Sequence, residues 1–159
     1  MILLTLGSQK FQFNRLLKKV DKLIEEGIIK EDVYAQIGFS DYKPKHFEYV
    51  DFLNQDDFQK IIEKCDYVIT HAGTGAILSS IKKGKKVIAI PRLKQYGEHV
   101  DDHQIQLINE FENLKLIEAC YDINKLEEAI ENIKTKEYDI YKSNTDSIIK
   151  SIDSFLKSF

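Results

Sequence analysis

Residues 67–78 read Tyr67-Val68-Ile69-Thr70-His71-Ala72-Gly73-Thr74-Gly75-Ala76-Ile77-Leu78. A short, apolar, β-branched run stops at small residues and glycines, and a helical pattern begins at once. We therefore predict a strand, a tight turn and a helix here. Such a turn presents free backbone N–H groups at a helix N-terminus, where an anionic group such as a phosphate can bind. The pattern alone equally allows a turn in which the glycines serve only close packing.

Strand-like and helix-like segments alternate along the whole chain of 159 residues, which is the size of one domain. The predicted strands cover residues 2–6, 32–37, 47–52, 67–70, 86–90 and 114–117. The predicted helices cover residues 11–26, 55–64, 74–83, 100–111, 123–134 and 138–159. This alternation is typical of parallel βαβ units. We expect an α/β fold: a single Rossmann-like domain over residues 1–159, with an open, mostly parallel sheet, helices on both faces and a ligand site beyond the carboxyl ends of the strands.

The composition favours a soluble globular protein and excludes several functions. Hydrophobic residues make up 43% of the chain and charged residues 31%, and the net charge is −3. The chain has no basic excess to neutralise a nucleic-acid backbone. Two cysteines, Cys65 and Cys120, with no signal-peptide pattern argue against a disulfide scaffold. No run reaches the roughly 20 apolar residues of a membrane span, so we expect any membrane association to be indirect.

The Gly73-Thr74-Gly75 turn matches neither of the common nucleotide-binding motifs. Leu78 stands where the Rossmann dinucleotide fingerprint has its third glycine. Gly84-Lys85 lacks the upstream glycine of a Walker A loop, because Ser79 stands there, and no Ser or Thr follows. The second predicted strand ends in Gln36-Ile37-Gly38 rather than in the acidic residue of an NAD site. A NAD-type domain is therefore the weaker alternative.

A second polar segment reads Gly97-Glu98-His99-Val100-Asp101-Asp102-His103-Gln104-Ile105-Gln106. His99 and His103 are four residues apart and would share a helix face, as zinc ligands can, but no third ligand lies at a suitable spacing. We expect instead the polar N-terminus of a helix that faces a ligand, with Asp101 or Asp102 at the cap and Gln104 bonded to a ribose or phosphate oxygen. An exposed helix face is the alternative for Gln104. We expect no metal and no cofactor.

Four other features carry weaker expectations. Arg92, at the end of the strand 86–90, is placed to meet an anion. The lysines of residues 82–86 are expected to form a solvated turn. A Cys65–His71 nucleophile pair is disfavoured because Cys65 lies in a predicted core position. The apolar stripe Ile148, Ile149, Ile152, Phe155, Leu156 and Phe159 packs on the sheet, docks a partner subunit or lies on a membrane surface; the pattern leaves these open.

Taken together, three segments resemble the C-terminal, donor-binding domain of MurG-type GT-B glycosyltransferases, the glycosyltransferase family 28 C-terminal type. They are Thr5-Leu6-Gly7-Ser8-Gln9 with Phe13-Asn14-Arg15-Leu16, His71-Ala72-Gly73-Thr74-Gly75, and Pro91-Arg92 through Glu98-His99-Val100-Asp101-Asp102-His103-Gln104. The chain is most similar to the short, stand-alone members: the Alg13-like proteins and the bacterial exopolysaccharide subunits of the PssE/Cps14G type.

This resemblance implies a UDP-sugar site. It places the donor diphosphate at Gly7, Ser8 and Gln9 and at the turn of His71, Gly73, Thr74 and Gly75, the uracil at Phe52 and Leu53, and the ribose and sugar at Asp102, His103 and Gln104. Ser79 stands where the family has a ribose-binding carboxylate, so UDP-galactose, UDP-N-acetylglucosamine and UDP-glucose all remain open as donors.

The resemblance also implies a partner, because a GT-B enzyme holds its acceptor between two Rossmann-like domains and this chain has the length of one. The implied function is the donor-binding subunit of a two-component glycosyltransferase of exopolysaccharide, capsule or lipid-linked oligosaccharide synthesis. It would transfer a hexose, Gal or GlcNAc, to a lipid-linked sugar.

The implied partner is a membrane-anchored, acceptor-binding subunit of the Alg14/PssD/Cps14F type, contacted by the helix 138–159. The chain would then be cytoplasmic and peripheral at the inner face of the membrane. The general base is expected on the partner, with His71 the candidate on this chain. The alternative is a non-catalytic enhancer or regulatory module of a partner glycosyltransferase.

Overall fold

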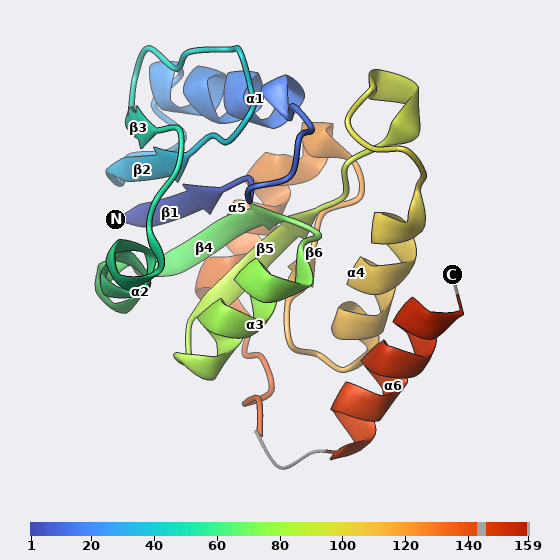
Figure 1. Cartoon of the computed structure of the whole chain (residues 1–159). Helices are drawn as coiled ribbons and strands as arrows, with labels where there is room; N and C mark the ends of the chain where they lie inside the picture. Colours follow the sequence, from blue (N-terminus) through green and yellow to red (C-terminus); the bar gives the residue numbers. More distant parts are fainter. Residues whose placement is uncertain (143–145, 159) are drawn as a thin grey trace.

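The computed structural model describes the backbone of residues 1–142 and 146–158 and the side chains of residues 1–142 and 150–158. Six parallel strands form one sheet in the order β3-β2-β1-β4-β5-β6 (Figure 1). The strands are β1 (Ile2–Thr5), β2 (Val33–Gln36), β3 (Glu48–Val50), β4 (Tyr67–His71), β5 (Lys86–Ile90) and β6 (Glu118–Ala119). The predicted α/β class and parallel sheet are confirmed.

Helices cover both faces of this sheet (Figure 1). They are α1 (Asn14–Glu25), α2 (Gln55–Lys64), α3 (Thr74–Lys82), α4 (His103–Asn113), α5 (Leu126–Thr135) and α6 (Asp146–Lys157), with short 3-10 turns η1 (Lys94–Tyr96) and η2 (Ile123–Lys125). One face packs against α1 and α5, and the other against α2, α3 and α4. Helix α6 packs on α4 and buries Ile152 there, so it lies outside the layer that touches the sheet.

The central strands are buried from both sides. Ile2 and Leu4 face the α1 and α5 layer, whereas Leu3 faces the α2, α3 and α4 layer. A strand buried on both faces has a continuous apolar sequence rather than an alternating one. This is why β1 and β4 are recognisable in the sequence as short apolar runs.

The chain order changes direction between β1 and β4. After β1 the chain moves outward to β2 and β3, then returns to β4 and continues to β5 and β6 on the other side. The connections that leave β1 and β4 therefore diverge, and they leave an opening at the carboxyl ends of these two strands.

Three predicted helices begin later than expected; in the third, residues 123–125 form the 3-10 turn η2 before α5 begins at Leu126. Helix α1 begins at Asn14 rather than at residue 11, because the Phe13 N–H donates to Ser40 Oγ (2.9 Å) and the backbone there is not helical. Helix α4 begins at His103 rather than at residue 100, where the His103 N–H donates to Asp101 Oδ1 (3.0 Å). At the starts of α1 and α4, a side chain outside the helix satisfies an N–H group.

Two predictions in the last third of the chain are wrong. The segment 114–117 is not a strand: the Leu116 N–H donates to the Phe111 carbonyl (3.1 Å), which closes α4, and β6 starts only at Glu118. Residues 138–142 are not helical; the Asp139 N–H bonds the Lys115 carbonyl (2.8 Å) instead. Residues 143–145 and 159 of the predicted last helix lie outside the described residues, as do the side chains of Ile148 and Ile149.

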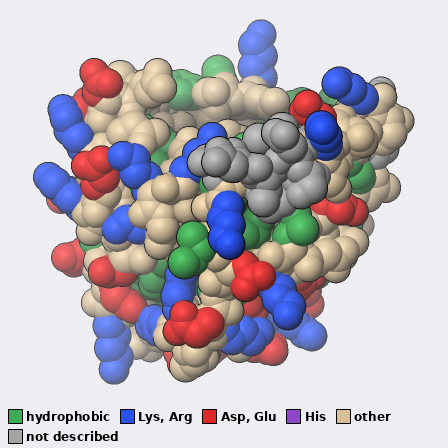
Figure 2. Space-filling model, turned by 90° about the horizontal axis from the view of Figure 1, so that it is seen from below, with side chains coloured by type: hydrophobic (Ala, Val, Ile, Leu, Met, Phe, Trp, Pro, Cys, Tyr) green, Lys and Arg blue, Asp and Glu red, His purple; other side chains and the backbone are tan. Residues whose placement is uncertain are grey.

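The lysines of residues 82–86 do more than line a solvated turn. Lys85 Nζ donates to the carbonyl of Cys65 (2.8 Å), and Lys86 Nζ donates to the carbonyls of Ile133 (3.1 Å) and Lys136 (2.8 Å). Figure 2 shows Lys and Arg side chains interspersed with Asp and Glu on the underside of the molecule.

Among residues 1–142 and 146–158, none of the helices has the length and apolar character needed to cross a membrane.

Candidate functional site

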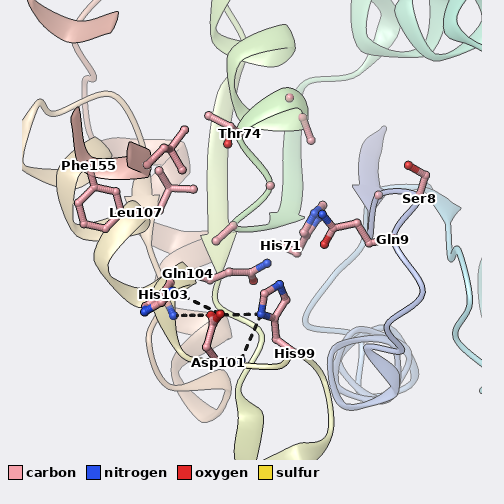
Figure 3. A pocket seen from close by; sticks show the side chains of 16 residues that line it. Ser8, Gln9, His71, Thr74, His99, Asp101, His103, Gln104, Leu107 and Phe155 are labelled. Carbon is pink, nitrogen blue, oxygen red and sulfur yellow. Dashed lines mark hydrogen bonds and ion pairs between the residues drawn. The ribbon is translucent and has the colours of Figure 1, made fainter. Parts of the chain in front are cut away.

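A cavity of about 480 Å³ opens at the carboxyl ends of β1, β4 and β5, where the chain order reverses (Figure 3). The turn after β1, the turn between β4 and α3, the connection between β5 and α4, and residues of α3, α4 and α6 line it. The lining residues are Gly7, Ser8 and Gln9 after β1; His71 at the end of β4; Ala72 and Gly73 between β4 and α3; Thr74, Gly75 and Ala76 in the first turn of α3; His99 and Asp101 between β5 and α4; His103, Gln104 and Leu107 on α4; and Phe155 and Leu156 on α6.

The start of α3 supplies the most direct anion-binding groups of the cavity. The first helical hydrogen bond runs from the Ile77 N–H to the Gly73 carbonyl (3.1 Å). The N–H groups of Thr74, Gly75 and Ala76 therefore precede it and have no partner within the helix. All three residues line the cavity. These groups and the positive end of the helix dipole suit a phosphate.

His71 lies beneath this turn, with its ring wedged between two glycines. It is 5% exposed. A Cβ atom at Gly73 would lie 2.2 Å from His71 Nε2, and one at Gly7 would lie 2.6 Å from His71 Cε1. Gly7 also has a φ of 71°, in the left-handed region that favours glycine. Both glycines are therefore needed for the ring to fit against the two turns.

The hydrogen bonds around His71 define which nitrogen carries its proton. The Thr70 hydroxyl donates its proton to the Thr5 carbonyl (2.9 Å). The Thr70 oxygen can therefore only accept a hydrogen bond from His71 Nδ1, which lies 3.3 Å away. The Nδ1 atom thus carries the proton, and Nε2 is an acceptor. Burial lowers the pKa of His71 to about 3, and the positive charge of Arg92 contributes. The ring is neutral at neutral pH and is a weak proton acceptor.

The opposite wall is organised by Asp101 (Figure 3). His99 Nδ1 and His103 Nδ1 each lie 3.3 Å from a carboxylate oxygen of Asp101. The backbone N–H of His103 lowers the pKa of Asp101, and the two imidazoles contribute. Within the described ranges 1–142 and 146–158, no group of three or more His, Cys, Asp or Glu side chains is arranged to hold a metal ion.

Most of the site residues expected from the sequence come together in this cavity. They are Gly7, Ser8, Gln9, His71, Gly73, Thr74, Gly75, His103 and Gln104. Gln104 is 9% exposed and accepts the backbone N–H of Arg92 at its Oε1 (2.9 Å), so it is not on an exposed face. The four expected residues outside the lining are Phe52, Leu53, Arg92 and Asp102.

Arg92 passes beneath the turn after β1 instead of facing the cavity. It is 1% exposed, and its Nη2 donates to the carbonyls of Leu6 (2.6 Å) and Phe11 (3.2 Å). Its Nε and Nη1 have no hydrogen-bond partner among the described residues. Burial lowers the pKa of Arg92 to about 10, so the guanidinium stays charged at neutral pH.

The other three expected residues also make contacts outside the cavity. Asp102 accepts the Lys94 N–H (2.8 Å). Phe52 is half-exposed, and its ring packs edge-on against Phe39 with the centroids 5.2 Å apart. The Leu53 N–H donates to Gln36 Oε1 (3.1 Å), while Gln36 Nε2 donates to the Gly7 carbonyl (3.1 Å). Gln36 thus connects the segment after β3 to the turn after β1.

Sequence reasoning missed part of the lining. Leu107 could have been found, because it follows His103 by four residues and Gln104 by three and so shares their face of α4. Phe155 and Leu156 carry no such signal. They reach the cavity only because α6 packs on α4. Cys65 precedes β4 and His71 is its last residue, so the two side chains stand at opposite ends of the strand.

The fold is that of a Rossmann-like α/β domain, and the N–H groups in the cavity at the reversal of its strand order suit an anionic ligand. Residues 1–158 match the model of the glycosyltransferase family 28 C-terminal domain. The chain belongs to this family.

Two relatives are named UDP-N-acetylglucosamine transferase subunit ALG13. The one from Candida albicans is 30% identical over 126 residues, which are 76% of this chain and 41% of the relative. The one from Kluyveromyces lactis is 33% identical over 101 residues, 64% of this chain and 43% of the relative. The chain thus matches less than half the length of these curated relatives.

Solved glycosyltransferases share the fold at low sequence identity. SnogD from Streptomyces nogalater aligns with a TM-score of 0.58 and 17% identity, covering 98% of this chain and 39% of SnogD. MurG from Acinetobacter baumannii aligns with a TM-score of 0.55 and 13% identity, covering 98% of this chain and 49% of MurG. The architecture is that of one half of a GT-B glycosyltransferase.

Proposed function

We propose that this chain is the donor-binding subunit of a two-component UDP-sugar glycosyltransferase. One observation carries the proposal. Thr74, Gly75 and Ala76, whose N–H groups have no partner within α3, line the same cavity as the turn of residues 7–9. The names of the two ALG13 relatives support it and favour N-acetylglucosamine over galactose as the sugar.

In this proposal the diphosphate lies at the start of α3, and the sugar lies against His103 and Gln104. The uracil lies toward Phe52 and Leu53, which Gln36 couples to the turn at Gly7. Arg92 acts from beneath that turn, where its buried charge makes the potential around the diphosphate more positive without direct contact. Backbone N–H groups and a helix dipole can serve here without a metal ion or cofactor.

The proposed reaction is an inverting displacement. The acceptor hydroxyl oxygen forms a bond to the anomeric carbon while the bond from that carbon to the UDP oxygen breaks. The N–H groups at the start of α3 stabilise the charge that develops on the departing diphosphate. The hydroxyl proton passes to a base on the partner, because His71, with a pKa of about 3, is poorly matched to this task at neutral pH.

The partner would supply the acceptor half of the enzyme. One Rossmann-like domain holds a donor, whereas a GT-B site lies between two. We assign this role to a membrane-anchored subunit of the Alg14/PssD/Cps14F type that presents a lipid-linked sugar, in exopolysaccharide, capsule or lipid-linked oligosaccharide synthesis. The chain would be held at the cytoplasmic face of the membrane through that subunit, with α6, whose Leu156 is half-exposed, as one contact.

A titration followed by backbone amide NMR tests the donor site, because it detects even millimolar affinity. UDP and UDP-sugars should shift the amides of residues 7–9, 52–54 and 71–76, whereas NAD and ADP should not. The sugar series then ranks the donors. Absence of uridine-specific shifts, with and without the partner subunit, would contradict the proposal.

The enhancer alternative is separated by assaying the partner alone. If the partner transfers sugar without this chain and the chain changes only the rate, the chain is a regulatory module. If transfer requires both chains and is lost when the 71–76 turn is rebuilt with bulky residues, the donor half lies here.

A further inference from the structure

The cavity wall that carries His99 and Asp101 belongs to a long connection. Residues 91–102 join β5 to α4 and contain only the short 3-10 turn η1. A surface connection of this kind is more mobile than the elements it joins. The distance of His99 and Asp101 from the turn of residues 7–9, on the opposite side of the cavity, therefore depends on contacts that the connection makes with other segments.

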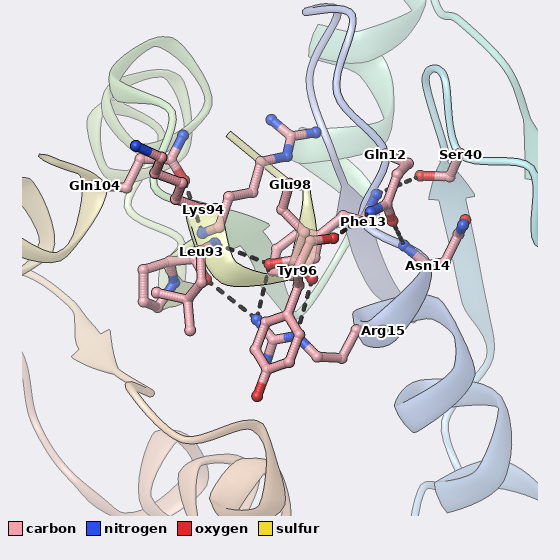
Figure 4. Close-up of polar contacts among 12 residues, drawn as sticks. Gln12, Phe13, Asn14, Arg15, Ser40, Leu93, Lys94, Tyr96, Glu98 and Gln104 are labelled. Atoms are coloured by element: carbon pink, nitrogen blue, oxygen red, sulfur yellow. Dashed lines mark hydrogen bonds and ion pairs between the residues drawn. The ribbon is translucent and has the colours of Figure 1, made fainter. Parts of the chain in front are cut away.

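An ion pair between the partly exposed Arg15 and the buried Glu98 attaches the connection to α1 (Figure 4). The Glu98 side chain is fully buried, and Arg15 of α1 donates to both of its oxygens, from Nε to Oε1 (2.9 Å) and from Nη2 to Oε2 (3.0 Å). The Leu93 N–H also donates to Oε2 (2.9 Å). Such a two-pronged arginine–carboxylate pair fixes orientation as well as distance.

Neighbouring contacts attach the same two segments to each other. The Arg15 guanidinium lies 4.6 Å from the centroid of the Tyr96 ring, and Gln12 Nε2 donates to the Tyr96 carbonyl (3.0 Å). The Phe11 and His99 rings pack with their centroids 4.8 Å apart. The segment from the Gly7 turn to Arg15 and the connection 91–102 are thus joined at several points.

We propose that Arg15 and Glu98 are positioning residues that set the separation of the two cavity walls. Neither lines the cavity, so they act through the residues that they hold, His99 and Asp101. The inference rests on the proposed function only for the identity of the ligand, a nucleoside diphosphate sugar. The ion pair should matter more for the sugar than for UDP, because the wall that it holds continues into His103 and Gln104.

The test compares Arg15→Lys and Glu98→Gln with the unmodified chain. Lysine keeps the charge but loses the two-pronged geometry, and glutamine keeps the shape but loses the charge. The matched control is Lys83→Met, which removes the 2.7 Å ion pair to Glu63 at the other edge of the sheet. Amide hydrogen exchange at residues 93–103, exchange in the core strands and the affinities for UDP and a UDP-sugar are measured on each.

We expect exchange at residues 93–103 to quicken about tenfold or more in both test variants, with the core strands unchanged. The UDP-sugar affinity should fall about tenfold and the UDP affinity by less, while the control matches the unmodified chain. Unchanged exchange at 93–103, or an equal loss for UDP and UDP-sugar, would overturn the inference. If the unmodified chain binds no uridine nucleotide, the proposed function fails, and the exchange data alone decide whether the ion pair holds the loop.

Discussion

The two ends of the strands differ in how their backbone groups are paired. At the amino ends of the strands, the amino edge of the sheet, lysine side chains donate hydrogen bonds to backbone carbonyls. At the carboxyl ends, the carboxyl edge, backbone N–H groups without a helical partner line a cavity. Lys85 and Lys86 donate to carbonyls at the ends of α2 and α5. The N–H groups of Thr74, Gly75 and Ala76 precede the first hydrogen bond of α3. Polar groups satisfied within the protein stabilise the fold, and polar groups left open can bind a ligand. Substitutions at the two edges should therefore affect different measurements.

The largest effect is expected for Gly73→Val at the carboxyl edge. A Cβ there would lie 2.2 Å from Nε2 of the buried His71 ring, so the turn and the ring must shift relative to each other. The displaced turn should weaken UDP binding by about a hundredfold or more, near 3 kcal/mol, and overpacking should lower folding stability by about 1–3 kcal/mol. UDP titration by NMR and urea unfolding measure the two effects.

Gly75→Ala is the matched control for the folding part of this prediction. The added Cβ would have no neighbour within 4 Å, and Gly75 lies in the first turn of α3. Because alanine has the higher helix propensity, by about 1 kcal/mol, this variant should unfold at the same or a higher urea concentration. Unimpaired UDP binding by Gly73→Val would show that the packing of His71 is irrelevant to the site.

The next effect concerns pH and His71. The ordinary pKa of the imidazole is 6.5, and in the folded protein burial and Arg92 lower it to about 3. Between these values the unfolded chain binds a proton that the folded chain does not. Stability is therefore fully present above pH 6.5 and is lost as the pH falls, by up to about 1.4 kcal/mol per pH unit from this group.

The measurement is urea unfolding of the unmodified chain and of His71→Asn at pH 7, 6 and 5. The contribution of the carboxylates is common to both proteins and cancels when they are compared. Between pH 7 and pH 5 the free energy of unfolding should fall by about 2 kcal/mol more in the unmodified chain than in His71→Asn. In the unmodified chain the His71 Cε1–H resonance should not titrate over this range. Equal slopes, or a midpoint near pH 6.5, would mean that the ring is open to water.

The order of apolar, polar and glycine residues along the chain was enough to predict the parallel sheet and the glycine turns. It failed where contacts between distant segments determine the structure. The strand, turn and helix of residues 67–78 could be predicted because each of them depends mainly on residues that are neighbours in the sequence. The apolar residues of 114–117 resemble a strand, yet Leu116 is buried at the end of a helix.

The same distinction holds for the site. The position of Arg92 after β5 indicates that it lies near the cavity, but not that its side chain passes beneath the Gly7 turn. Phe155 is far along the chain from the other lining residues, and only the packing of α6 on α4 brings it there. Contacts between distant segments cannot be inferred from periodicity or turn chemistry.

The smallest effect is expected for Lys86→Met at the amino edge. Its Nζ donates to the carbonyls of Ile133 and Lys136 at the end of α5, where a positive charge also complements the helix dipole. Methionine keeps the apolar stem but leaves these carbonyls to water, so stability should fall by about 1 kcal/mol. The affinity for UDP should not change, because Lys86 lies at the opposite end of β5 from the cavity. A loss of affinity matching that of Gly73→Val would mean that the two edges are coupled through the sheet and that the division between them does not hold.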